Sequence, residues 1–262
     1  MGPTTVTSTK EGFEMWLDLN DKLISEAIVA TGTWEPHVTS VFKKELHKKT
    51  DAVLLDVGAN MGWFTLMAAA LPQCAKVIAL EPNWGNLQLL YRSLIRNGFD
   101  NVTVYPYAAT DARSLVQLTS SSGDTGTGFT SPVNSKTSLD ITIVQGVKLD
   151  DLLGDEPRID IIKMDIDGNE PCAIAGMLGV IEKHRPVIMA EFFPKGLKEL
   201  AGIDPEEYLD TFTALGYSYA VIDMEGREVM CNSAEEVMRL WKSHGLDTKV
   251  GSDIHLDFIA RP

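Results

Sequence analysis

The chain has 262 residues, of which 44% are hydrophobic, so it can bury the core of a single α/β enzyme domain. Its 37 acidic and 23 basic side chains give a net charge of -14 at pH 7, which argues against nucleic acid or an anionic membrane as a main partner. No apolar run reaches the roughly 20 residues of a membrane span, and Met1–Lys10 lacks a signal-peptide core, so we expect a cytoplasmic protein. Cys74, Cys172 and Cys231 are widely spaced and indicate neither a disulfide framework nor a zinc site.

The N-terminal residues 1–50 are predicted to form a helical cover that belongs to the same domain as residues 51–262. Gly12–Leu46 contains two helical patterns on either side of Thr31-Gly-Thr-Trp-Glu-Pro36. We expect these helices to lie over one edge of the sheet that the rest of the chain forms.

A strand, a tight turn and the start of a helix follow one another from Ala52. The run Ala52–Val57 is apolar except for Asp56, which predicts a buried strand. Gly58 and Gly62 bracket a turn, and the segment to Leu71 has helical spacing. This arrangement places a ligand above the turn, at the N-terminus of the helix.

The middle of the turn indicates which ligand it takes. A dinucleotide site uses G-x-G-x-x-G so that the backbone can approach a pyrophosphate, but Asn60 and Trp63 replace the second and third glycines here. Glu81 ends the next apolar run, where a carboxylate can accept hydrogen bonds from both ribose hydroxyls. Asp56 would repel a pyrophosphate but would balance a cationic ligand. The pattern favours S-adenosylmethionine, with an ordinary turn that happens to contain glycines as the alternative.

Helices and strands alternate along the rest of the chain. Asn83–Asn97 has a leucine-rich helical face and stops at Gly98. Ala108 and Ala109 follow the strand Val102–Tyr105, where two small residues either let an adenine ring lie flat or only pack. Further strands are expected at Ile159–Met164, Val187–Ala190, Tyr217–Ile222 and Ile254–Ile259. Seven strands with intervening helices predict a doubly wound α/β sheet, with the last strand antiparallel beside the sixth.

Residues 119–138 stand outside this alternation, because fourteen of the twenty are Ser, Thr or Gly. Leu115–Leu118 and Ile141–Val144 look like the two strands of a hairpin that holds this segment near the site. We predict a loop or lid in which Phe129 reaches a substrate. A loop without any role is the equal alternative.

Acidic residues follow the fourth and fifth predicted strands, at the edge where open α/β sheets bind ligands. We assign Asp165 and Asp167 to the active site, where a transferred group would be presented. Glu170 would lie in the first turn of the next helix and is interpreted as a capping residue. Glu191 is a further acid that can act as a base or orient a hydroxyl. His255, in the last strand, is interpreted as structural.

Together these motifs resemble the FkbM family of S-adenosylmethionine-dependent methyltransferases. They are Gly32-Thr-Trp-Glu-Pro36, Leu55-Asp-Val-Gly-Ala-Asn-Met-Gly62, Glu81-Pro82, Lys163-Met-Asp-Ile-Asp-Gly-Asn-Glu170 and Glu191. The likeness extends over about residues 12–225, and it implies a class I methyltransferase (Rossmann-like) fold that methylates hydroxyls of sugars or natural-product scaffolds. One departure is Asp167, where the family more often has Glu.

The resemblance also implies which residues hold the cofactor and which do the chemistry. Cofactor roles carry over to Glu35, Asp56, Gly58, Asn60, Gly62, Glu81 and Asn83. The neighbouring Ala59 and Pro82, the pair Ala108 and Ala109, and Asp165 complete the predicted cofactor set. Active-site roles carry over to Asp165, Asp167 and Glu191.

The sequence therefore predicts an S-adenosylmethionine-dependent O-methyltransferase with a small-molecule or glycan acceptor. A carboxylate is expected to take up the proton of the acceptor hydroxyl. We prefer this mechanism to a Mg²⁺ ion held by Asp165 and Asp167, and predict no dedicated metal site. Two other classes are less favoured: a NAD-dependent oxidoreductase, because of Asn60 and Trp63, and a catalytically silent methyltransferase-like binding domain, because the acidic cluster is intact.

Overall fold

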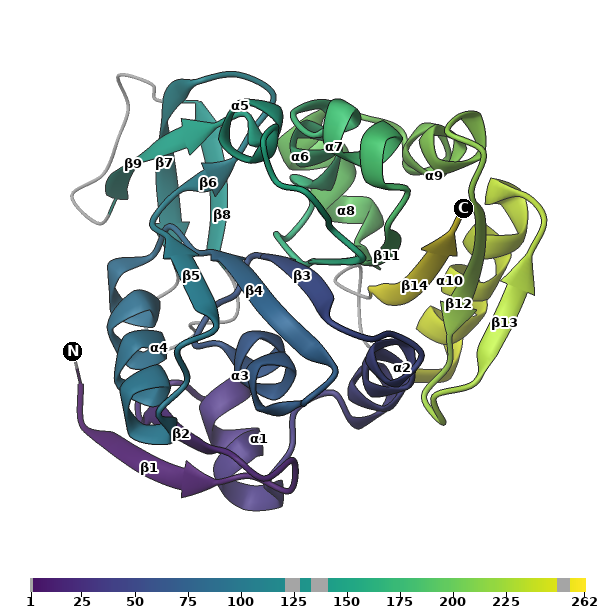
Figure 1. Ribbon diagram of the computed structural model, residues 1–262. Coiled ribbons are helices and arrows are strands. Elements are labelled where there is room, and N and C mark those ends of the chain that lie inside the picture. Colours follow the sequence, from purple (N-terminus) through teal and green to yellow (C-terminus); the bar gives the residue numbers. More distant parts are fainter. Residues whose placement is uncertain (1, 121–127, 133–140, 249–254) are drawn as a thin grey trace.

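The computed structural model describes residues 2–120, 128–132, 141–248 and 255–262, which form a large sheet with helices on both faces and two smaller sheets (Figure 1). The large sheet has eight strands in the order β13-β12-β14-β11-β10-β3-β4-β5. Their bounds are β3 Ala52–Val57, β4 Cys74–Leu80, β5 Val102–Tyr105, β10 Ile161–Met164, β11 Val187–Phe192, β12 Ser218–Ile222, β13 Glu228–Cys231 and β14 Leu256–Arg261.

The chain winds outward from β3 in both directions. It first adds β4 and β5 on one side, then returns to add β10 and β11 in parallel on the other side. The strand order therefore switches between β3 and β10, where doubly wound sheets bind their ligands. β14 lies antiparallel between β11 and β12. The predicted doubly wound sheet and its antiparallel last strand are confirmed.

An eighth strand corrects the prediction of seven. β13 pairs antiparallel with β12 at the edge of the sheet, with Glu228 opposite Ile222. Three of its four residues, Glu228, Val229 and Met230, are exposed, and only Cys231 is buried. An exposed edge strand lacks the continuous apolar run by which a buried strand is recognised, so the sequence pattern missed it.

The hydrophobic core has two halves, one on each face of the large sheet. Val53, Leu55 and Val57 of β3 enter one buried cluster, whereas Ala52 and Leu54 enter the other. Because side chains alternate between the faces of a strand and both faces are covered by helices, β3 is apolar along nearly its whole length.

The helices divide between these two halves. Helices α1 to α4 pack on the face of Ala52 and Leu54, and α5, α6, α7, α9 and α10 pack on the other face. The bounds are α1 Ile24–Thr31, α2 Pro36–His47, α3 Trp63–Ala70, α4 Trp84–Asn97, α5 Leu149–Leu153, α6 Glu170–Ala175, α7 Leu178–His184, α8 Pro194–Gly196, the π-helical turn Leu197–Ala201, α9 Pro205–Ala214 and α10 Ala234–Thr248. None of the described helices has the length and apolar character to cross a membrane.

The N-terminus differs from the predicted helical cover. β1 Thr4–Ser8 and β2 Glu14–Asp18 form an antiparallel hairpin, and the first helix begins only at Ile24. Within β2, Met15 and Leu17 are fully buried while their neighbours are partly exposed. This alternation is the period of a strand, and it was hidden in a segment that we interpreted as helical.

The hairpin is fixed to α4, far along the chain. The backbone N–H of Glu14 donates to Asn97 Oδ1 at 2.8 Å, and that of Trp16 donates to Ser93 Oγ at 2.9 Å. The hairpin therefore extends the helical layer beside α1 and α4 (Figure 1).

A separate sheet has the order β6-β9-β7-β8, with β6 Ala108–Ala109, β7 Ser114–Ser120, β8 Gly128–Pro132 and β9 Ile141–Val147. The predicted hairpin is confirmed, because β7 and β9 pair antiparallel with Val116 opposite Val144. Most of the predicted lid at 119–138 lies outside the described residues. Its described part includes the strand β8 in place of the predicted loop, because the backbone of Phe129 pairs with that of Thr119. The role of the segment as a lid stays a prediction.

The turn after β3 fits closely against the end of β10. Gly58 has φ +84°, and a Cβ there would lie 2.0 Å from the carbonyl oxygen of Asp165. Gly98, which ends α4 with φ +68°, has no atom within 4 Å of the same position. Of these two glycines, Gly58 is therefore required both by its backbone conformation and by lack of space, and Gly98 by its backbone conformation alone.

Replacing Gly58 by Ala should destabilise the protein more than replacing Gly98 by Ala. Both substitutions strain a left-handed backbone, but Gly58→Ala also forces a methyl group into the backbone of Asp165, and such overpacking costs about 1–3 kcal/mol. Urea unfolding of the two variants measures this difference in the free energy of unfolding. Equal losses would show that the turn is free to move away from β10.

Candidate active site

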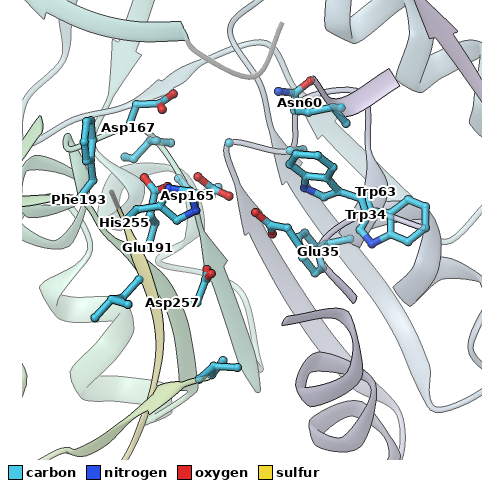
Figure 2. A pocket seen from close by; sticks show the side chains of 18 of the residues that line it. Trp34, Glu35, Asn60, Trp63, Asp165, Asp167, Glu191, Phe193, His255 and Asp257 are labelled. Carbon is cyan, nitrogen blue, oxygen red and sulfur yellow. The ribbon is translucent and has the colours of Figure 1, made fainter. Parts of the chain in front are cut away.

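A cavity of about 970 Å³ opens at the carboxyl ends of β3, β4, β10 and β11, beside the switch in strand order. Figure 2 shows its two walls, with Trp34, Glu35, Asn60 and Trp63 on one side and Asp165, Asp167, Glu191, His255 and Asp257 on the other. The predicted site residues that line it are Glu35, Gly58, Ala59, Asn60, Glu81, Pro82, Asn83, Ala108, Ala109, Asp165, Asp167 and Glu191. Of the predicted site residues, only Asp56 and Gly62 do not line the cavity.

Glu81 joins the end of β4 to the turn after β3. One carboxylate oxygen, Oε2, accepts the backbone N–H of Asn60 at 2.8 Å, and Oε1 accepts that of Asn83 at 2.6 Å. Glu81 is 5% exposed, and its burial raises the pKa of its carboxyl to about 7. The side chain of Asn83 caps α4 by accepting the backbone N–H of Gly85 at 2.8 Å. Both residues therefore shape the site as well as line it.

The turn itself is held by backbone contacts. The N–H groups of Gly58 and Ala59 both donate to the carbonyl oxygen of Leu80, at 3.0 and 2.9 Å. Asn60 has φ 52°, and two more cavity residues, Glu35 at 39° and Asp167 at 56°, also have the left-handed backbone that non-glycine residues seldom adopt. Strained backbone of this kind tends to cluster at functional sites.

Asp56 and Gly62 lie at the two ends of the turn and do not line the cavity. Asp56 is 2% exposed, and its Oδ2 accepts the hydroxyl of Thr65 on α3 at 2.5 Å. Burial raises the pKa of Asp56 to about 6, although the Thr65 hydroxyl opposes the rise. Gly62 precedes α3 with φ 98°. The structure therefore places the Asp56 carboxylate against α3, away from the cavity in which we predicted that it would face a cationic ligand.

Lys163 is a buried cation to which the sequence analysis gave no role. Its side chain is 1% exposed, and Nζ lies 3.1 Å from Asp165 Oδ2 and 4.9 Å from the centre of the Phe64 ring. Burial alone would lower the pKa of Lys163, but the charges of Asp165, Asp257 and Glu35 raise it above its usual value. Lys163 therefore stays protonated. It lies next to the side of the cavity formed by Asp165, Asp167, Glu191 and Asp257, which we call the acidic wall.

His37, His255 and Asp257 are further cavity residues that the sequence analysis did not assign to the site. His37 Nε2 lies 3.6 Å from Asp257 Oδ2, and His255 Nδ1 lies 3.5 Å from Glu191 Oε1. His255 is thus part of the cavity wall, contrary to the structural role we gave it. The signal was present in the sequence, because His255 and Asp257 are two residues apart and share one face of an extended chain.

Carboxylates from distant parts of the chain face one another across the cavity. Glu35 precedes α2, and its carboxylate points across the cavity toward Asp165 and Asp257 (Figure 2). Burial raises the pKa of Glu35 well above its usual range, and the charges of Asp257 and Asp165 add to the rise. Burial raises the pKa of Glu191 in the same direction, together with the charges of Asp165 and Asp167. These groups can therefore hold protons or attract a cation.

Glu170 is fully buried and supports the loop that carries the acids. Its Oε1 accepts the backbone N–H of Ile166 at 3.0 Å. This contact holds the loop before α6 and does not cap the helix, which has no side-chain cap, so the capping interpretation is wrong. Asp165 and Asp167 are the acids of that segment that line the cavity.

The comparisons identify the family. The sequence model of the methyltransferase FkbM domain matches residues 56–219, so the chain belongs to the FkbM methyltransferase family and the resemblance is confirmed. The predicted class I methyltransferase fold is confirmed with it, since the strand order of the large sheet has the central switch described above. No curated protein matches the chain.

Several solved structures are similar to the chain at low identity. A methyltransferase FkbM from Methylobacillus flagellatus has 19% identity and a TM-score of 0.47, with 69% of this chain and 43% of that chain covered. A precorrin-6y C5,15-methyltransferase from Geobacter metallireducens has 13% identity and a TM-score of 0.46, with 91% and 94% covered. M. jannaschii TYW2 in complex with AdoMet has 15% identity and a TM-score of 0.45, with 100% and 86% covered. The chain spans less than half of the first of these proteins.

Replacing Lys163 by Met should destabilise the protein strongly at pH 8. The substitution leaves the carboxylates of Asp165 and Asp257 without their buried cation, which costs about 3 kcal/mol, the low end for a buried pair because Asp165 is partly exposed. Lys163 is protonated in the folded and unfolded states between pH 5.5 and 8, so its own charge does not change there. The pKa of the neighbouring Glu35 is raised well above its usual value by burial, so the loss should shrink at pH 5.5, where Glu35 takes up a proton and no longer interacts with Lys163 as an anion. Urea unfolding at both pH values measures it.

The exposed Lys198 gives a matched control, since its Nζ lies 3.9 Å from an equally exposed Asp204. Lys198→Met should change the free energy of unfolding little at either pH. A loss for Lys163→Met that does not depend on pH would mean that packing, and not charge, explains the effect.

Proposed function

We propose that this member of the FkbM methyltransferase family binds S-adenosylmethionine beside Glu81 and transfers its methyl group to a hydroxyl of a small molecule or glycan. The observation that carries the proposal is the position of Glu81, a buried carboxylate at the end of β4 that is tied to the turn after β3 and lines the cavity. A carboxylate at this point of a doubly wound sheet accepts the hydroxyls of a ribose.

The residues around Glu81 suit the rest of the nucleoside. Ala108 and Ala109 form the short strand β6 and line the same cavity, where their small side chains leave a flat surface for an adenine ring. Asn60, in the turn after β3, and Pro82, which follows Glu81, also line the cavity. We assign this half of the cavity to the cofactor. Glu35, which faces Asp257 and Asp165, is assigned to the other half.

The acidic wall suits an acceptor. S-adenosylmethionine would supply an electrophilic methyl group, so the protein has to hold the hydroxyl oxygen in line with that carbon and remove its proton. In this reaction the oxygen–carbon bond forms as the sulfur–carbon bond breaks, and the hydroxyl proton passes to a carboxylate. Glu191 has a raised pKa and is the base we favour, with Asp165 and Asp167 orienting the acceptor.

Calorimetric titration separates this function from the alternatives. The purified protein should bind S-adenosylmethionine and S-adenosylhomocysteine and should not bind NAD, because Asn60 occupies the place of a pyrophosphate-contacting glycine. A mass-shift screen against glycans and hydroxylated metabolites then looks for the gain of one methyl group. Binding of NAD alone would favour an oxidoreductase, and cofactor binding with no methyl transfer to any acceptor would favour a silent binding domain.

Replacing Glu81 by Gln should weaken S-adenosylmethionine binding at least tenfold at pH 8. The amide keeps the size of the side chain but removes the charge, and each hydrogen bond to a charged group contributes about 1.5–3 kcal/mol. Calorimetry measures the affinity, and circular dichroism checks that the variant is folded. Unchanged affinity in a folded variant would contradict the ribose assignment.

The same carboxylate should make cofactor binding depend on pH. Because burial raises the pKa of Glu81 to about 7, the side chain is protonated below pH 7 and then accepts the ribose hydroxyls less well. Wild-type affinity should therefore fall by about tenfold from pH 8 to pH 6, relative to Glu81→Gln, which has no carboxyl to titrate there. Parallel pH profiles for the two proteins would assign the dependence to another group.

A further inference from the structure

Side chains of three residues, of types that bind metals, converge from the two walls of the cavity and from opposite ends of the chain. Glu35 precedes α2, whereas His255 and Asp257 come from the start of β14, and one ligand atom from each lies within 4.8 Å of the others. We propose that Glu35, His255 and Asp257 bind a divalent transition-metal ion.

Two buried carboxylate oxygens at this place could each bind a cation. Glu35 Oε2 and Glu191 Oε2 are buried, and neither has a hydrogen-bond partner among the described residues. Glu191 is only 9% exposed, and its other oxygen lies 3.5 Å from His255 Nδ1. A buried polar atom without a partner is costly, so its usual explanation is a donor or an ion that completes the site.

The charge of the wall also leaves room for a cation. Lys163 is the buried cation at its base, and its ammonium group already pairs with Asp165 at 3.1 Å. The carboxyl groups of Glu35, Glu191 and Asp257 also surround the proposed site, which is more than one ammonium group can pair with. A divalent ion could bind the groups that Lys163 does not pair with.

Two of the three ligands have neighbours that would orient them. Glu191 lies beside Nδ1 of His255, so a proton on Nδ1 leaves Nε2 with the lone pair that binds a metal. His37 lies 3.6 Å from Asp257 Oδ2. A carboxylate next to a metal-binding histidine is the common outer-shell arrangement of protein metal sites.

The donor set indicates the kind of metal. One imidazole nitrogen with carboxylate oxygens suits Mn²⁺, Fe²⁺, Co²⁺ or Zn²⁺, whereas Mg²⁺ prefers oxygen ligands and water. The site therefore differs in place and chemistry from the Mg²⁺ alternative at Asp165 and Asp167 that the sequence suggested.

The role of the metal rests on the proposed function. An acceptor hydroxyl bound to the ion would have a lower pKa, so its proton would pass more readily to Glu191 before or during methyl transfer. Asp165 lines the same wall, so the metal and the predicted active-site acids would act on one substrate.

The test uses the full-length protein, treated with EDTA and then titrated with Mn²⁺ alone. Free Mn²⁺ is followed by its electron paramagnetic resonance signal, and we expect one equivalent to bind. His255→Ala and Asp257→Asn should each weaken binding at least about tenfold. Titration with Co²⁺ gives a second readout. The visible absorption bands of bound Co²⁺ should change in His255→Ala, because this variant lacks the imidazole nitrogen.

Matched controls are His47→Ala and Asp210→Asn, which alter exposed residues outside the cavity and should bind Mn²⁺ like the wild type. We expect His255→Ala to fold like the wild type, because that side chain is 48% exposed. Absence of a saturable site in the wild type, or equal binding by wild type and His255→Ala, overturns the proposal. The proposal is also overturned if the wild type does not bind Mn²⁺ while Glu35→Gln weakens S-adenosylmethionine binding. Failure of the wild type to bind S-adenosylmethionine would overturn the proposed function and leave the Mn²⁺ result standing.

Discussion

The buried ammonium group of Lys163 is the interaction on which the acidic half of the site depends. Its positive charge interacts with the carboxyl groups of Asp165 on the next loop, Glu35 before α2 and Asp257 in the last strand. These carboxylates come from the middle and both ends of the chain, and without a cation between them they would repel one another in a poorly solvated place. Lys163 is fully buried in the centre of the sheet, so it cannot move to meet them, and the chain has to fold around it.

This constraint divides the cavity into halves that are built differently. Around Glu81 the contacts join neighbouring strands, since its carboxylate accepts the N–H groups of Asn60, after β3, and of Asn83, after β4. Around Lys163 the contacts join segments more than a hundred residues apart, as between Glu35 and Asp257. The half around Glu81 therefore needs the pairing of β3 with β4, whereas the acidic half also needs β14 and the start of α2 to be docked on the sheet.

The same division explains what the sequence could predict. The strands Ala52–Val57 and Val102–Tyr105, the helix ending before Gly98, and Glu81 at the end of the second strand all follow from local patterns, and the structure has them where expected. The contact between His37 and Asp257 was missed because nothing in either local segment indicates that they meet, although the spacing of His255 and Asp257 places those two on one face. The hairpin before Ile24 was missed for another reason: its period-two pattern was too short to override the helical spacing around it.

Asp56 lies in the predicted motif, but its side chain does not face the cavity as predicted. It lies one strand position from the turn, and the sequence suggested that it would face a cationic ligand. Side chains alternate along a strand, however, and the helix α3 packs on the face to which Asp56 points, so its carboxylate accepts the hydroxyl of Thr65 instead. A buried acid that ties β3 to α3 fixes the angle at which the helix leaves the turn. The backbone groups of Gly58 and Asn60 are then held where a ligand can reach them, which makes Asp56 a positioning residue of the site and not a part of its surface.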